Sequence, residues 1–285
     1  MITPKTIILP IDFSAPASRT AAHASILARQ YGATVVLLHV LPPMLPPSLE
    51  MGGSMEMMVE WYREQKPAME ARLQEFAKKH LAGCQTKTVC REGDAADEIL
   101  SVARGEKADL IMLATHGYGA FRRLLLGSVA AKVLHDAHIP VLTSAHVESP
   151  SGDVEKVKSI VVAVEADARA AKLIAAGAGM AKEFGAALHV VHATPEDGSG
   201  AVTYQDPAWR LEVAAKLEEL VQEAGAQATV HVVPGEAAAA VRQVATDVMA
   251  DLVILGRHVD HGVLGRLWAH SYAIVREAPC AVLSI

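Results

Sequence analysis

Two glycines and a serine in the segment ATHGYGAFRRLLLGS, residues 114–128, are the first candidates for chemistry in this sequence. Nine residues separate Gly117 from Gly127, which directly precedes Ser128. Glycine lets a backbone approach a phosphate group closely, and a helix that begins here would direct free N–H groups and the positive end of its dipole at that anion. Ser128 could cap the helix or donate to a phosphate oxygen. An ordinary helix start has the same pattern, so the spacing alone leaves both interpretations open.

Other candidate groups give weaker signals. A histidine cluster in the second half could hold zinc, but its spacing lacks a clear helical frame, which favours ordinary hydrogen-bonded side chains; its members are His258, Asp260, His261 and His270. His39 and His192 end two apolar segments, and a hydrogen-bonded packing role is the simpler interpretation for both. Ser14 and Ser128 have no identifiable partner base, and no Walker lysine follows Gly127. The sequence therefore nominates no catalytic residue.

The elements around these candidates occur twice. TIILPIDFS (6–14) returns as SIVVAVEAD (159–167), and YGATVVLLHVLP (31–42) returns as FGAALHVVHATP (184–195), both at an offset of 153 residues. ADLIMLATH (108–116) returns as ADLVILGRH (250–258) at an offset of 142 residues. A fixed pattern of this kind indicates a tandem duplication, whose second copy is shorter in its middle.

Each copy alternates branched aliphatic runs with segments of helical period, which is typical of βαβ units and a parallel sheet. Hydrophobic residues make up 51% of the 285 residues and aromatic residues only 4%, which also favours an α/β fold. The polar stretch 146–159 predicts a linker between domains at 1–146 and 156–285. Expected strands are 6–11, 34–40, 86–90, 109–114, 139–143, 159–164, 187–192, 228–233, 252–256 and 280–284; expected helices of the first copy are 15–31, 60–81, 95–105 and 128–137.

Charge and cysteine content restrict the class of partner. The formal net charge is −6 and the sequence has no basic block, so neither a nucleic acid nor a membrane surface is expected as a partner. The three cysteines form no CxxC pair, and Asp12 interrupts the start of the chain before a signal-peptide core could form. We therefore expect a cytoplasmic protein.

The whole chain resembles the universal stress protein family in a tandem, two-domain form. The resemblance is carried by PIDFS (10–14), LLHVLP (37–42), the segment 114–128 and HIPVLTS (138–144). ATP-binding members of that family show G-x-x-G, nine residues, then G-S/T, which this chain matches at Gly117, Gly127 and Ser128 but with Ala114 as the first residue. The resemblance implies two doubly wound, five-stranded, Rossmann-like domains of the adenine nucleotide alpha hydrolase type.

The resemblance also implies ATP with Mg²⁺ in the first domain, with adenine and ribose near Asp12 and the backbone of Val40. The candidate nucleotide-binding residues are Pro10, Asp12, Val40, Leu113, Ala114, His116, Gly117, Gly127, Ser128 and Val129. Arg122 and Arg123 could reach the phosphates or form a solvated loop face. A left-handed backbone at Ala114 would cost about 1–2 kcal/mol because of its methyl group, whereas a negative φ would cost little.

The second copy departs from the motif. With a one-residue deletion in the loop, its residues at these positions are Glu165 for Asp12, Gly256 for Ala114, Val259 for Gly117, Trp268 for Gly127 and Ala269 for Ser128. A β-branched valine resists positive φ, and an indole at the helix start would occupy phosphate space. We expect this half to bind no ATP, or to bind a different ligand.

The resulting hypothesis is a regulatory stress-response protein. Nucleotide in the first domain would order residues 115–127 and change a surface read by an unidentified protein partner. The methionine-rich segment 42–62 could be a lid, a core cover or a subunit contact. In the family, paired last strands imply an intrachain pseudo-dimer, and a homodimer of the whole chain stays open. The alternatives are a nucleotide-independent scaffold and a slow ATPase, so enzyme activity is left undecided.

Overall fold

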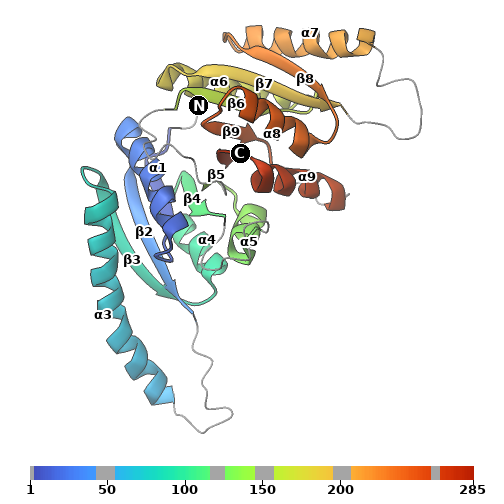
Figure 1. Ribbon diagram of the computed structural model, residues 1–285. Helices are drawn as coiled ribbons and strands as arrows, with labels where there is room; N and C mark the ends of the chain where they lie inside the picture. The colour runs from blue at the N-terminus through green and yellow to red at the C-terminus, as the bar shows by residue number, and fades with distance from the viewer. Residues whose placement is uncertain (1–2, 43–54, 116–125, 145–156, 195–206, 258–263) are drawn as a thin grey trace. The chain divides into compact units, whose positions relative to one another are not determined.

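The two repeats fold as successions of parallel strands and helices in a computed structural model, which describes residues 3–42, 55–115, 126–144, 157–194, 207–257 and 264–285 (Figure 1). The elements of the first repeat are β1 (Thr6–Pro10), α1 (Ala15–Tyr31), β2 (Thr34–Leu41), α3 (Met55–His80), β3 (Gln85–Glu92), α4 (Ala95–Gly105), β4 (Leu110–Ala114), α5 (Ser128–Asp136) and β5 (Val141–Ser144). Those of the second are β6 (Ser159–Ala163), α6 (Ala170–Phe184), β7 (Ala187–Thr194), α7 (Pro207–Glu223), β8 (Thr229–Pro234), α8 (Ala237–Asp247), β9 (Leu252–Leu255), α9 (Leu264–Glu277) and β10 (Ala281–Ser284).

The predicted α/β class with parallel sheets is confirmed. The first four strands of the first repeat have the order β3-β2-β1-β4, and those of the second have the equivalent order β8-β7-β6-β9, with β10 beside β9. β1 pairs in parallel with β2 and β4, and β2 with β3; in the second repeat β6 pairs in parallel with β7 and β9, β7 with β8, and β9 with β10. All ten expected strands are present, with ends that differ by a few residues, and α3 begins earlier than expected.

The chain divides into two compact units. Among the described residues, the first contains residues 3–42, 55–115 and 127–141, and the second contains residues 126, 142–144, 157–194, 207–257 and 264–285. From Leu142 onward β5 therefore groups with the second unit, where Thr143 Oγ1 donates to the carbonyl oxygen of Val282 in β10 at 3.3 Å.

Helices cover both faces of the sheet in each unit. In the first unit α1 and α3 pack on one face while α4 packs on the other, beside α5 (Figure 1). In the second unit α6 and α7 share one face, and α8 and α9 share the opposite one. This doubly wound arrangement explains why the central strands read as unbroken apolar runs: the side chains of Ile7–Leu9 and Ile160–Val162 are fully buried.

The duplication is visible in the backbone as well as in the sequence. Gly32 ends α1 at φ 64° and Gly185 ends α6 at φ 65°, in the left-handed conformation that glycine adopts without a Cβ penalty. Asp109 accepts hydrogen bonds from the N–H groups of Lys5 and Thr6, while Asp251 accepts them from residues 158 and 159. In both units a carboxylate before the fourth strand therefore fixes the entry of the first strand.

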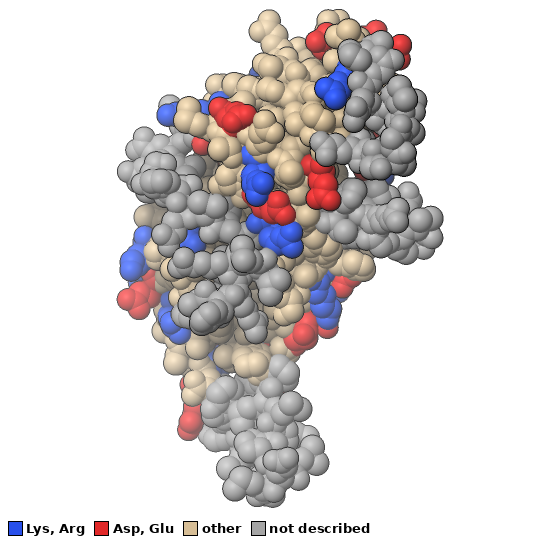
Figure 2. Space-filling model, turned by 45° about the vertical axis from the view of Figure 1, so that its right-hand side comes forward, with Lys and Arg blue, Asp and Glu red and all other residues tan. Residues whose placement is uncertain are grey.

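Charges are mixed on the face of the molecule drawn in Figure 2. On the face drawn in Figure 2, Lys and Arg side chains lie among Asp and Glu side chains, and the described residues gather into no broad area of one sign. Within the same part of the chain, no helix is both long enough and apolar enough to cross a membrane.

One pair of histidines distinguishes the second sheet from the first. The ring nitrogens His189 Nδ1 and His231 Nε2 lie 3.2 Å apart on β7 and β8. The offsets of 153 and 142 place Val36 and Val89 at the same positions in the first repeat. Burial lowers the pKa of both imidazoles, with a smaller lowering of His189 by His231 and an opposing contribution from Asp247 at His231. The folded state therefore favours the neutral pair.

We expect this pair to make the protein less stable in acid. Between the lowered pKa values and the ordinary value of 6.5, the unfolded chain binds more protons than the folded one, so stability falls as pH decreases through this range. Urea unfolding above pH 7 and near pH 5 measures the loss. Replacing the pair with the valines of the first repeat, His189→Val with His231→Val, should make the loss smaller. An equal loss in both proteins would refute this origin of the pH dependence.

Candidate functional site

The strand order reverses at the same point in each unit. In the first unit the chain runs from β1 to β2 and β3 on one side, then returns to β4 on the other. Ligands of doubly wound sheets bind beyond the carboxyl ends of the strands at such a reversal, here between β1 and β4. Asp12 follows β1 and Thr115 follows β4, so the turns that flank this reversal carry the predicted site.

Asp12 is held by the turn that follows it. Its Oδ1 atom accepts hydrogen bonds from the N–H of Ser14 at 2.9 Å and from Ser14 Oγ at 2.6 Å. Ser14 Oγ in turn accepts from the N–H of Ala17, at 3.3 Å, as the N-cap of α1. The exposed Asp12 carboxylate is therefore fixed in orientation by the buried cap of a helix.

Phe13 connects this turn to the helical layer. Its φ is 62°, a left-handed value that is rare for a bulky residue and costs free energy unless packing compensates for it. The ring lies 5.0 Å from the ring of His39 and 6.0 Å, edge to face, from that of Phe76 in α3, measured between centroids. Arg72 of α3 lies over the same ring, 3.9 Å from its centroid. Helix α3 thus stabilises the strained residue between Asp12 and Ser14.

The backbone conformation of Ala114, at the end of β4, decides whether its methyl group causes strain. Ala114 is the last residue of an extended strand, and positive φ among the described non-glycine residues is confined to Phe13, Lys107 and Met249. The alanine methyl group therefore introduces no left-handed strain, and the departure from the family motif does not disturb the backbone.

The start of α5 differs in detail from the expectation. Gly127 is the N-cap residue with φ −62° and ψ 147°, and its N–H donates to the carbonyl of Thr115 at 2.8 Å. Ser128 is the first residue of the helix and does not cap it, which corrects one of the two roles considered for its hydroxyl. Ser128 and Val129 are exposed. Their N–H groups belong to the first turn, where the helix leaves backbone donors without intrahelical partners.

The other predicted contacts lie along the same edge or outside the described residues. Pro10 ends β1, and Val40 is paired with Arg91 near the end of β2. Leu113 is buried in β4. The predicted residues that fall outside the described part of the chain are His116, Gly117, Arg122 and Arg123.

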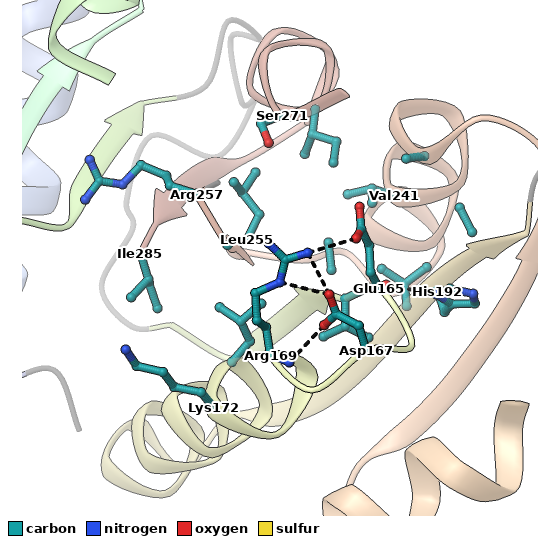
Figure 3. Close-up of a pocket in the computed structure, with 18 of the residues that line it drawn as sticks. Glu165, Asp167, Arg169, Lys172, His192, Val241, Leu255, Arg257, Ser271 and Ile285 are labelled. Carbon is teal, nitrogen blue, oxygen red and sulfur yellow. Dashed lines mark hydrogen bonds and ion pairs between the residues drawn. The ribbon is translucent and has the colours of Figure 1, made fainter. Parts of the chain in front are cut away.

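A cavity of about 1070 Å³ lies at the equivalent edge of the second unit (Figure 3). It is bounded by the ends of β6, β7 and β9, the first turns of α6 and α8, and residues of α9. The sequence left open that this half binds a ligand other than ATP, but without the phosphate-binding motif it indicated no residues for such a site. The feature that indicates a ligand site here is the strand order, which reverses between β6 and β9.

The second unit replaces the Asp12 turn by an ion-pair cluster. Arg169 donates from Nε and Nη2 to Asp167 Oδ2 at 2.8 and 2.6 Å, and its Nη2 lies 3.3 Å from Glu165 Oε2. Figure 3 shows the three side chains together at the end of β6. Burial would raise the pKa of Asp167, but hydrogen bonds from Arg169 outweigh it and lower the pKa. The cluster thus holds two acids against one guanidinium.

Two further expectations concern the second unit. Helix α9 begins at Leu264, so Trp268 and Ala269 lie inside a helix and do not occupy the position that precedes α5 in the first unit.

The predicted packing of the equivalent histidines is confirmed, since His39 Nδ1 donates to the carbonyl of Ile11 at 2.6 Å and His192 Nδ1 to that of Val164 at 3.0 Å. The candidate zinc ligands His258, Asp260 and His261, and the side chain of His270, lie outside what the structure describes; the described residues contain no group of three or more His, Cys, Asp or Glu side chains that could hold a metal ion.

The strain at Phe13 predicts an unusual order of stability. Phe13→Ala and Phe13→Gly both remove the ring, but glycine adopts positive φ freely, so the glycine variant should be the more stable by about 1 kcal/mol in urea unfolding. Ala166 takes this position in the second unit and lacks positive φ, so Ala166→Gly should lower stability. A Phe13→Ala variant as stable as Phe13→Gly would contradict the assignment of strain.

Comparison with known proteins gives one family for both halves. The sequence matches the Universal stress protein family over residues 3–144 and again over residues 156–285. A universal stress protein of Methanocaldococcus jannaschii is 34% identical over 138 residues, covering 48% of this chain and 80% of that protein. Another, from Thermus aquaticus, is 37% identical over 144 residues, covering 48% of this chain and 96% of that protein.

The fold of the whole chain is similar to that of a solved protein of similar length. The crystal structure of a universal stress protein from Archaeoglobus fulgidus has a TM-score of 0.68 at 21% identity, covering 99% of this chain and 96% of the other. This likeness extends over both units and concerns the fold alone. Two family matches in one chain, on two repeats of one doubly wound fold, show that this protein belongs to the universal stress protein family in a tandem form.

Proposed function

We propose that this chain is a regulatory protein that binds ATP with Mg²⁺ in its first domain, residues 1–146. The observation that carries the proposal is the convergence of Asp12 and the start of α5 on the β1–β4 reversal. One side offers a carboxylate held by Ser14, and the other offers the N–H groups of an exposed helix start at Ser128 and Val129. A ribose and a phosphate chain require hydrogen-bonding groups of these two kinds.

The adenine moiety would lie along the edge formed by Pro10, Val40 and Leu113. The side chains here are apolar, and the half-buried Val40 lies near the end of a strand, where backbone groups can bind a base. Phosphates would lie over Gly127, whose lack of a side chain leaves its backbone open to close approach even though its φ does not require glycine.

The available groups fit magnesium. Mg²⁺ in nucleotide sites is usually held by one or two carboxylates together with phosphate oxygens and water. Asp12 supplies one exposed carboxylate at the site, and bound ion would neutralise phosphate charge there. Ser14 Oγ donates to Asp12 Oδ1, but this hydroxyl is buried as the N-cap of α1, so the proposal includes nucleotide binding and not a dedicated hydrolysis step.

The regulatory part of the proposal rests on Phe13. The turn that orients Asp12 is packed against Phe76 and Arg72 of α3, so a ligand that fixes this turn also favours one arrangement of α3. A ligand can shift a conformational equilibrium only through such a difference in affinity between two states. We propose that a protein partner reads the α3 side of the domain when nucleotide is bound.

Calorimetric titration of the nucleotide-stripped chain with Mg-ATP tests the binding site. One site per chain is expected, and Asp12→Asn should weaken binding about tenfold or more because it removes a charged acceptor. Asp136→Asn, at the opposite end of α5 from Ser128, is the matched control and should leave the affinity within about twofold. Absence of binding, or an Asp12→Asn variant with unchanged affinity, would refute the proposal and favour a nucleotide-independent scaffold.

The backbone at Ala114 leads to a second expectation. Because Ala114 has no left-handed strain, restoring the family glycine with Ala114→Gly should change the affinity for Mg-ATP by less than about twofold. The same variant should lower stability by about 0.5–1 kcal/mol, because glycine weakens a strand. A tenfold gain in affinity would show that the methyl group does obstruct the nucleotide.

A further inference from the structure

We propose that the cavity of the second unit binds a small organic acid, a ligand with an apolar body and one carboxylate group. This is a second site with a different ligand class, and it does not depend on ATP binding in the first unit. The cavity, the interrupted phosphate site and the charges on its wall carry the inference.

The cavity has the position and lining of a ligand site. It opens at the reversal between β6 and β9, where doubly wound sheets bind ligands. Its volume of about 1070 Å³ lies at the upper end of the range of small-molecule pockets. Aliphatic side chains from both helical layers and from the strand ends line it: Leu173, Val191, Val241, Leu255 and Ile274. An apolar body gains free energy by covering this surface.

A triphosphate does not suit this cavity. The first unit directs the start of α5 at its crevice, whereas α9 continues through the equivalent positions and contributes Ser271 and Ile274 from its later turns. The carboxylate of Glu165, at the position of Asp12, already lies beside Arg169. The second unit therefore lacks both features that support nucleotide binding in the first.

Two cations favour an anionic group on the ligand. Lys172 of α6 and Arg257 after β9 both line the cavity, and Figure 3 shows them on the side where Ile285 lies, away from His192. Arg169 lies between Glu165 and Asp167, and this cluster of two acids and one guanidinium lies at the end of β6, separate from the Lys172 ammonium. Burial lowers the pKa of the Arg257 guanidinium, which shows that this cation is partly removed from water. A carboxylate near a partly desolvated cation is bound more strongly than one at the surface.

The remaining acid on the wall lies apart from these cations. Glu236 is the N-cap residue of α8, on the opposite face of the sheet from α6, which carries Lys172. The wall thus has a basic side, an apolar centre and an acidic rim. A single carboxylate at the basic side fits this division, whereas several negative charges along the cavity would approach Glu236.

The test uses octanoate and octanol, which share an apolar body and differ in the carboxylate. Displacement of anilinonaphthalene sulfonate fluorescence from the full chain reports their binding. Octanoate should bind about tenfold more tightly than octanol. Lys172→Gln should remove most of this difference and leave octanol unchanged, whereas Lys182→Gln, an exposed lysine farther along α6, should change neither.

A filled cavity supplies the second arm. Ala176→Leu places a larger side chain on the lining and should weaken both ligands about tenfold or more, while Ala178→Leu, on the same helix but not on the lining, should not. Thermal unfolding identifies variants that do not fold. Octanol binding as tightly as octanoate, or octanoate binding that is insensitive to Ala176→Leu, would overturn the proposal.

Nucleotide binding here is the remaining contrary outcome. If Mg-ATP displaces the dye from the unaltered chain but not from the Ala176→Leu variant, the second unit is a nucleotide site. That result would overturn the organic-acid assignment. Failure of octanoate to bind leaves the calorimetric test of the first unit unaffected, because the two experiments use different ligands and variants of different units. The two proposals can therefore fail separately.

Discussion

Parallel pairing of one buried strand with neighbours on both sides is the constraint from which both sites follow. β1 pairs with β2 and β4, and β6 pairs with β7 and β9. Since helices cover both faces, the central residues of these strands, 7–9 and 160–162, are fully buried and apolar. The polar groups of the candidate sites therefore lie in the turns at the carboxyl edge, where the chain turns away from the sheet in opposite directions after β1 and β4. The crevice between those turns is a consequence of the topology, whatever residues line it.

The sequence predicts this framework well because burial leaves a strong pattern. A strand covered on both faces needs a continuous apolar run, and two copies of each run at fixed offsets reinforce the assignment. The candidate site is predicted less completely. Asp12 and Ser128 follow from the motif, but the positive φ of Phe13 has no signature in the sequence, because it depends on packing against α3. The sequence also does not reveal that α9 begins early. The loop before this helix aligns with the first repeat only when a one-residue deletion is introduced, and the position of that deletion does not follow from the sequence.

The two units show that the framework and the polar edge vary independently. The backbone devices are the same in both: left-handed glycines at Gly32 and Gly185, and the Asp109 and Asp251 carboxylates that hold the first strands. The edge chemistry differs, since the first unit orients its carboxylate with a helix-capping serine, whereas the second compensates its acids with Arg169. Ser14 is buried, but the carboxylates and Arg169 are exposed or half-buried, where ion pairs and hydrogen bonds contribute little to stability.

Such independence allows a repeat to keep its core while the side chains at its candidate ligand site change. A buried strand tolerates few substitutions because a cavity or an overpacked side chain costs several kcal/mol. The second unit has Glu165 and Asp167 where the first has Asp12 and Ser14. This difference alters no buried apolar contact, so it costs little free energy of folding. A nucleotide site is lost in this way before the crevice is, because the crevice is set by strand order and the phosphate contacts by a few turn residues. The surviving cavity then takes its specificity from whichever side chains stand at its edge, which in this chain include Lys172 and Arg257.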